Sequence, residues 1–164
     1  MGYDRVLVTL DGSKFAEIAL EHAIKIASPG ANIHVLSVMA QDAISEMASL
    51  VSAVAQPPAT EDQTWPPIQK PDDPRAAHAR EGYLRQVSDW LAQAGYDVTV
   101  EVRPGSVIET IVSVAQDGFQ IIVMATHGRS GIARVALGSV AEGVLHRSPC
   151  PVLIIPARAV PPQA

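Results

Sequence analysis

A glycine-rich segment in the second half of the chain carries the residues best suited to binding an anion. Residues 125–131 read Ala-Thr-His-Gly-Arg-Ser-Gly, and Gly138-Ser139 follow Gly128 after nine intervening residues. Glycine lets backbone N–H groups approach an anion closely, and N–H groups at the start of a helix form a cradle for phosphate. Serine hydroxyls and one arginine in these segments add further donors. The pattern predicts a nucleotide-phosphate site in outline, although a single glycine-rich turn is more often only turn geometry.

An acidic residue follows the first apolar run of the chain. Residues 6–10 are apolar except for Thr9 and end at Asp11-Gly12-Ser13. Asp11 either contacts a ligand or stabilises the N-terminus of the next helix through its charge. In open α/β sheets, ligands bind beyond the carboxyl ends of the strands, where the strand order reverses. The turns after the first and fourth strands are therefore the expected positions of a site.

Apolar runs alternate with amphipathic stretches along the chain, which predicts an α/β fold. We expect an open, parallel, five-stranded, Rossmann-like sheet with helices on both faces. The expected strands are residues 6–10, 33–38, 98–103, 121–125 and 152–155. Period-two alternation marks 98–103 as an edge strand with one wet face. The expected helices are 15–26, 106–115, 133–146 and a crossover helix from about 74 to 94, with a possible short helix at 42–54.

Local signals give sharper expectations. Ser13 is suited to cap the first helix, Ser106 and Glu109 form a capping-box pattern, and Pro29-Gly30 should break the chain before the second strand. Gly143, inside the last helix, indicates close packing. On the crossover helix, the residues expected to face inward are Ala77, Leu84, Val87, Trp90 and Leu91.

These residues resemble the universal stress protein family, whose nucleotide-binding members carry Gly-x2-Gly-x9-Gly-Ser/Thr after the fourth strand. Ala125 takes the place of the first glycine, Gly128 that of the second, and Gly138-Ser139 that of the final pair. Residues 6–13 are also similar to the family's first strand and turn. The resemblance implies one domain over 1–164 of the adenine nucleotide alpha hydrolase-like type, with strand order 3-2-1-4-5. The resemblance does not extend to a proline-rich insertion at about 40–74 or to a short tail at 157–164.

The resemblance also implies a ligand and the residues that bind it. The ligand is ATP, with Mg brought by the nucleotide. Asp11 and the backbone near Thr9 would meet the adenosine, and the backbone of Val38 would meet the adenine edge. The remaining residues would surround ribose and phosphates. The implied binding set is Thr9, Asp11, Val38, Ala125, Thr126, His127, Gly128, Arg129, Ser130, Gly131, Gly138, Ser139 and Val140.

Composition narrows the class of protein. The 164 residues suit about one domain, and 48% hydrophobic residues supply a core. A net charge of −5 and few aromatic residues argue against a nucleic-acid partner. No apolar run approaches the roughly 20 residues of a membrane span, and no Cys/His cluster or HExxH motif indicates a metal. The single cysteine, Cys150, favours a reducing, cytoplasmic location.

Three functions remain open on the sequence. The first is a non-enzymatic, ATP-binding stress-response regulator, dimeric through strand 152–155 as the resemblance implies, whose nucleotide state alters its dimer or partner surface. The second is slow ATP hydrolysis or self-phosphorylation at Ser130 or Ser139, although the sequence has no Walker A lysine loop. The third is an interaction module without nucleotide, because Ala125 adds a methyl group and Thr9 replaces a common proline. The proline-rich residues 56–74 would then be a docking element or simply a surface insertion.

Overall fold

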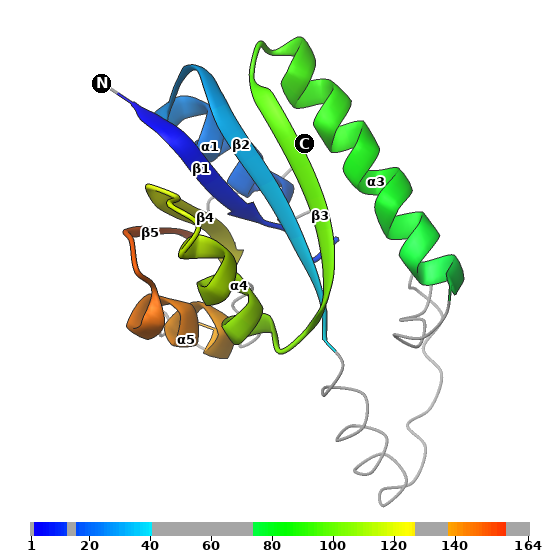
Figure 1. The fold of residues 1–164 in the computed structure, drawn as a ribbon, viewed down its shortest axis with the longest axis vertical. Helices are drawn as coiled ribbons and strands as arrows, with labels where there is room; N and C mark the ends of the chain where they lie inside the picture. The colour runs from blue at the N-terminus through cyan, green and yellow to red at the C-terminus, as the bar shows by residue number, and fades with distance from the viewer. Residues whose placement is uncertain (1, 13–15, 41–73, 127–137, 157–164) are drawn as a thin grey trace, which may run out of the picture.

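The computed structural model describes residues 2–12, 16–40, 74–126 and 138–156 of the chain. They form one five-stranded sheet in the order β3-β2-β1-β4-β5, and all four strand pairs are parallel (Figure 1). The predicted fold class and strand order are confirmed. The strands are β1 (Tyr3–Thr9), β2 (Ala27–Ala40), β3 (Asp97–Gly105), β4 (Ile121–Thr126) and β5 (Val152–Pro156). The helices are α1 (Glu17–Ile26), α3 (Pro74–Gln93), α4 (Val107–Ala115) and α5 (Ser139–Arg147).

Helices cover both faces of the sheet, as predicted. Side chains alternate along each strand, so Val6 and Val8 of β1 lie in one apolar cluster and Leu7 lies in the other. The first cluster is completed by α1 and α3, and the second by α4 and α5. Strands apolar on both faces are typical of a sheet buried between two helical layers.

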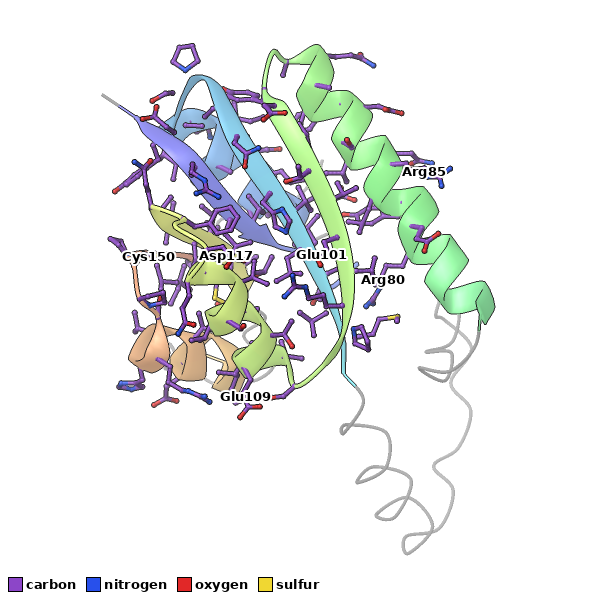
Figure 2. All side chains as sticks on the ribbon, viewed as in Figure 1. Arg80, Arg85, Glu101, Glu109, Asp117 and Cys150 are labelled. Atoms are coloured by element: carbon purple, nitrogen blue, oxygen red, sulfur yellow. The ribbon has the colours of Figure 1, made fainter. Side chains whose placement is uncertain are left out.

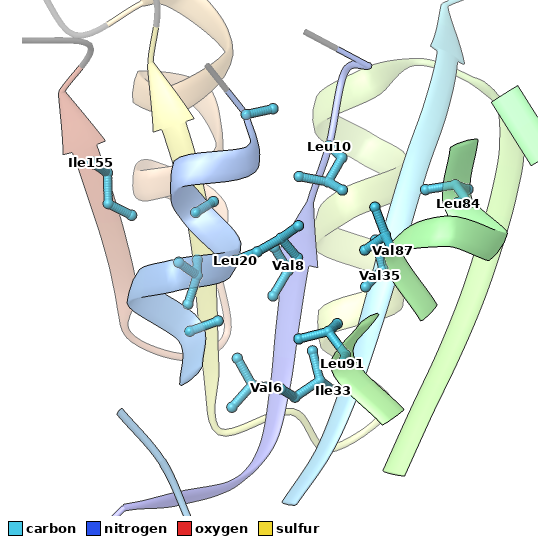
Figure 3. Packing of buried hydrophobic residues seen from close by; sticks show 14 of the residues in the cluster. Val6, Val8, Leu10, Leu20, Ile33, Val35, Leu84, Val87, Leu91 and Ile155 are labelled. Atoms are coloured by element: carbon cyan, nitrogen blue, oxygen red, sulfur yellow. The ribbon is translucent and has the colours of Figure 1, made fainter. Parts of the chain in front are cut away.

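The larger cluster joins the two helices on its face to the centre of the sheet (Figure 3). From α3, Leu84, Val87 and Leu91 are buried against it, which confirms three of the predicted inward positions. Leu20 of α1 is buried over the neighbouring strands. Burying each of these leucine and valine side chains contributes about 1.5–3 kcal/mol, so their packing holds α1 and α3 on the sheet.

Strand β2 is longer than predicted. It begins at Ala27 and runs through Pro29-Gly30, where a break was expected. The pairing shifts there, from Tyr3 opposite Ala27 to Arg5 opposite Asn32. Gly30 absorbs the extra residues because its φ of 75° is open to glycine at little cost. The predicted break is therefore an irregularity inside the strand.

The helix starts also differ from the predictions. Helix α1 has Ala16 at its N-cap, so it begins after Ser13, which lies outside the described residues. Ser106 is the N-cap of α4, yet its side chain makes no cap hydrogen bond and the capping box does not form. Glu109 instead has an oxygen 3.9 Å from Arg147 on α5. Tertiary contact thus replaces the local cap.

Trp90, which was predicted to face inward, and Val100 are both exposed at the β3 edge of the sheet. Trp90 of α3 is 47% exposed and Val100 of β3 is 38% exposed. The confirmed edge position of β3 explains both, since no further strand continues the surface that α3 could cover. The side chain of Ala77, the predicted helix at 42–54, the proline-rich insertion and the tail lie outside the described residues. In the described part of the chain, no helix is long and apolar enough to cross a membrane.

Candidate functional site

Five of the predicted site residues lie together where β1, β2 and β4 have their carboxyl ends. Thr9 pairs with Leu36 of β2 on one side and Met124 of β4 on the other. Asp11 lies two residues after Thr9, and Val38 lies in β2 two residues after Leu36. Ala125 and Thr126 end β4. The chain leaves β1 towards β2 through α1 and enters β4 from β3 through α4, on opposite faces. The strand order therefore reverses between β1 and β4, where open α/β sheets bind ligands.

Gly138 and Ser139 stand at the very start of α5. Gly138 is the N-cap, with an extended backbone at φ −60° and ψ 150°, and Ser139 is the first helical residue. The prediction that this pair lies inside a helix running from 133 is therefore wrong at Gly138. The first helical bond joins the Glu142 N–H to the Gly138 carbonyl at 2.9 Å, and no side chain makes a cap hydrogen bond here. The N–H groups of residues 139–141, Val140 included, thus point out of the helix end, as a phosphate cradle requires.

Ala125 fits its position without backbone strain. No described non-glycine residue has a positive φ, so this position does not demand glycine. Its methyl group packs against the cluster that α1 covers. The five residues that follow Thr126 in the predicted set, namely His127, Gly128, Arg129, Ser130 and Gly131, lie outside the described residues.

Arg80 of α3 reaches the carboxyl ends of β1 and β2 (Figure 2). It was not among the predicted site residues. Its guanidinium donates to the carbonyl of Val38 at 3.3 Å and to that of Asp11 at 3.1 Å. A Cβ added at Gly12 would lie 3.6 Å from the same group. The signal that could have found it is spacing: Arg80 stands four residues before Leu84 on the buried stripe of α3.

A tyrosine lies beside the same strand ends. Burial, followed by the negative charges of Glu17 and Asp11, raises the pKa of Tyr83 well above its ordinary value of 10.0. Its hydroxyl therefore keeps its proton throughout the physiological range. With Arg80, it places two hydrogen-bond donors of α3 near the start of α1.

A hollow of about 420 Å³ lies elsewhere, beside the C-terminal end of α4. His34 Nδ1 is 2.7 Å from Thr99 Oγ1, and Nε2 is 3.3 Å from a carboxylate oxygen of Glu101. Arg103 donates to the other oxygen of Glu101 at 2.5 Å, and Arg5 lies over the Phe119 ring. The carboxylate of Glu101 is therefore already paired within this hollow. Among the described residues, no group of three His, Cys, Asp or Glu side chains is arranged to hold a metal.

Comparison with known proteins decides the family. The model of the universal stress protein family matches residues 2–156. The chain belongs to the universal stress protein family. It is 29% identical over 157 residues to universal stress protein MJ0577 of Methanocaldococcus jannaschii, covering 93% of this chain and 94% of that protein. It is 28% identical to universal stress protein YxiE of Bacillus subtilis, covering 93% and 99%.

Solved structures of this family share the fold. The MJ0577 structure superposes with a TM-score of 0.71 at 24% identity, over 95% of this chain and 97% of that one. UspA from Lactobacillus plantarum gives 0.63 at 25% identity, over 94% and 99%. A universal stress protein in complex with cAMP gives 0.57 at 25% identity, over 94% and 98%. The fold of this chain is therefore that of solved family members over nearly its whole length.

Proposed function

We propose that this universal stress protein binds an adenine nucleotide, ATP with its Mg, at the carboxyl ends of β1 and β4. One observation carries the proposal: Gly138 and Ser139 form the N-cap and first residue of α5, with no side-chain cap. This leaves the first N–H groups of the helix for phosphate, and the helix dipole favours negative charge there.

The base and ribose would lie over the ends of the neighbouring strands. Thr9, Asp11 and Val38 come together at this edge, and Ala125 and Thr126 end the adjacent strand. A relative at 25% identity was solved in complex with cAMP, which supports an adenine nucleotide as the ligand class. Bound Mg would neutralise part of the phosphate charge.

We further propose binding, not catalysis, as the role of this site in a cytoplasmic stress-response regulator. Nucleotide state would change a homodimer formed through β5 or the surface offered to a protein partner. The position of β5 at the edge of the sheet supports the dimer, because an apolar edge strand invites pairing. Phosphate release from Mg-ATP above a protein-free blank, and lost in Gly138→Asp, would contradict the non-enzymatic part.

Thermal unfolding with and without Mg-ATP tests the binding site. Ligand at 100 times its Kd adds about 2.7 kcal/mol, which for a domain of this size raises Tm by roughly 5–10 °C. Gly138→Asp should abolish the rise, because its carboxylate would repel phosphate. Asp is itself a good N-cap, and φ at this position is negative, so the variant should unfold no earlier than wild type without ligand.

Gly82→Asp is the matched control, since Gly82 lies on α3 with no atom within 4 Å of an added Cβ. It should keep the rise in Tm. No rise in the wild-type protein at millimolar Mg-ATP, or an equal rise in Gly138→Asp, would refute the proposed site.

A further inference from the structure

The carbonyl of Val38 extends past the end of the neighbouring strand. In parallel sheets, the carbonyls of alternate residues point to the same neighbour. Leu36 directs its carbonyl to β1, where it accepts the N–H of Leu10 at 2.9 Å. The carbonyl of Val38, two residues on, points the same way, but β1 ends at Thr9. It therefore needs a donor from outside the sheet.

Arg80 is that donor. One guanidinium nitrogen donates to Val38 at 3.3 Å and the other to the Asp11 carbonyl at 3.1 Å, so the group bridges β2 and β1 across the gap. Arg80 is held there because it lies on the inward stripe of α3, four residues before the buried Leu84. A partly buried carbonyl left without a donor carries a free-energy cost, so any ligand that displaces Arg80 must supply a donor of its own.

We propose that Arg80 is a specificity-determining residue of the nucleotide site, because it competes with the amino group of a base for the Val38 carbonyl. The inference rests on the proposed function. The 6-amino group of adenine is a donor to the same carbonyl, and the guanidinium that lies against this carbonyl competes with it for the same space. Hypoxanthine carries an oxygen at the same position, which leaves Arg80 on Val38 and accepts one of its remaining N–H groups.

Removal of the guanidinium should therefore act on the two bases in opposite directions. Adenine no longer competes for Val38, whereas hypoxanthine loses a charged donor. A purely structural Arg80 would change the affinity for both bases equally. The change in the ratio of ATP to ITP affinity between variant and wild type thus separates the two roles, because these nucleotides differ only in the 6-substituent and in N1, which accepts in adenine and donates in hypoxanthine.

The test measures Kd for Mg-ATP and Mg-ITP by calorimetry on full-length wild type, Arg80→Met and Arg80→Lys. Met keeps an apolar stem and removes every donor, and Lys keeps the charge with a single donor atom. Arg80→Met should bind ATP about fivefold to tenfold more tightly than wild type and raise the ATP-to-ITP ratio by at least that factor. Arg80→Lys should fall between the two. Arg85→Met, on the exposed side of the same helix, is the control and should match wild type.

Each outcome is decisive. If wild type binds ATP and both Arg80 variants keep its ATP-to-ITP ratio, the inference is wrong and the proposed function stands. Weaker ATP binding in Arg80→Met would make Arg80 a direct ligand contact and would also overturn the inference. No binding of either nucleotide by any folded variant would refute the proposed function, and the inference with it.

Discussion

His34 is enclosed by partners from β3 and from the segment between α4 and β4. Its ring contacts Thr99 and Glu101 of β3 and lies 5.4 Å from the centre of the Phe119 ring. Arg103 and Asp117 act on it at longer range. Burial lowers its pKa from 6.5, against the opposing effect of Glu101, so the folded protein favours the neutral ring.

Acidification should therefore destabilise the protein through His34. As pH falls through 6.5, the unfolded chain takes up a proton that the folded chain does not, so the free energy of unfolding falls until the lowered folded pKa is reached. Urea unfolding at pH 7.5 and 5.5 should show a smaller loss in His34→Gln than in wild type. His146→Gln, whose side chain is 73% exposed, should behave as wild type. Equal losses in His34→Gln and wild type would contradict this role.

Whether a residue's contacts can be predicted from the sequence depends on how far along the chain its partners lie. Asp11 and Gly138-Ser139 were predicted as site residues because their signal lies in short motifs. Arg80 was missed because its acceptor, Val38, is 42 residues away, and His34 because Thr99 is 65 residues away. Such contacts exist only after the strands have paired. The local spacing places Arg80 on the buried stripe of α3 but does not give its acceptor.

Helices α4 and α5 meet at a glycine, as the sequence predicted. A Cβ at Gly143 of α5 would contact the side chain of Ile108 on α4, with Cγ1 at 3.1 Å and Cγ2 at 3.4 Å, besides its Cδ1. Both helices cover the same sheet face, and Ala141 and Val144 of α5 are buried in that cluster. The missing side chain sets how closely the two helices approach.

Gly143→Ala should lower the free energy of unfolding by about 1 kcal/mol, because overpacking outweighs the gain in helix propensity. Gly82→Ala adds the same methyl group to α3 where no atom lies within 4 Å, and it should stabilise by about 0.5–1 kcal/mol. Urea unfolding of both variants measures the difference. Adding Ile108→Val, which removes Cδ1, should recover part of the loss in Gly143→Ala. A stabilised Gly143→Ala would show that Ile108 moves away freely.

Element types were easier to predict than element ends. Apolar periodicity identified every strand and the four described helices, since it reflects the two buried faces of the sheet. The ends of α1 and α5 and the start of β2 were misplaced because they depend on backbone geometry. Gly138 has an extended ψ of 150° directly before the first residue of α5, and Gly30 continues β2 with a φ of 75°. A glycine in the sequence does not reveal which of these it will do.

The whole molecule has two sheet edges, and they differ in composition. β3 presents Thr99, Glu101 and Arg103 on one face, whereas β5 is apolar from Val152 to Ile155. The N–H of Ile122 on β4 donates to the Pro151 carbonyl. The backbone groups of Pro151 and Leu153 therefore face β4. Val152 and Ile154 therefore direct their backbone groups away from the sheet. A dimer through β5 would use these groups.

Ile154→Pro should separate the proposed dimer into monomers without breaking the β4–β5 ladder, because proline removes an N–H that faces outward. Sedimentation at micromolar concentration should give twice the 17.3 kDa chain mass for wild type and for the control Ile154→Val, and the chain mass for Ile154→Pro. A wild-type protein that sediments only as the monomer would remove the dimer from the proposed function.

Linkage then joins the dimer to the nucleotide. If Mg-ATP strengthens dimerisation by some factor per site, the monomeric Ile154→Pro must bind Mg-ATP more weakly by that same factor, because the coupling free energy is reciprocal. The two factors come from separate measurements, sedimentation of wild type with and without Mg-ATP and calorimetry of the variant. Equal affinities in wild type and Ile154→Pro, with a dimer that ignores Mg-ATP, would show that nucleotide state acts on some other surface than β5.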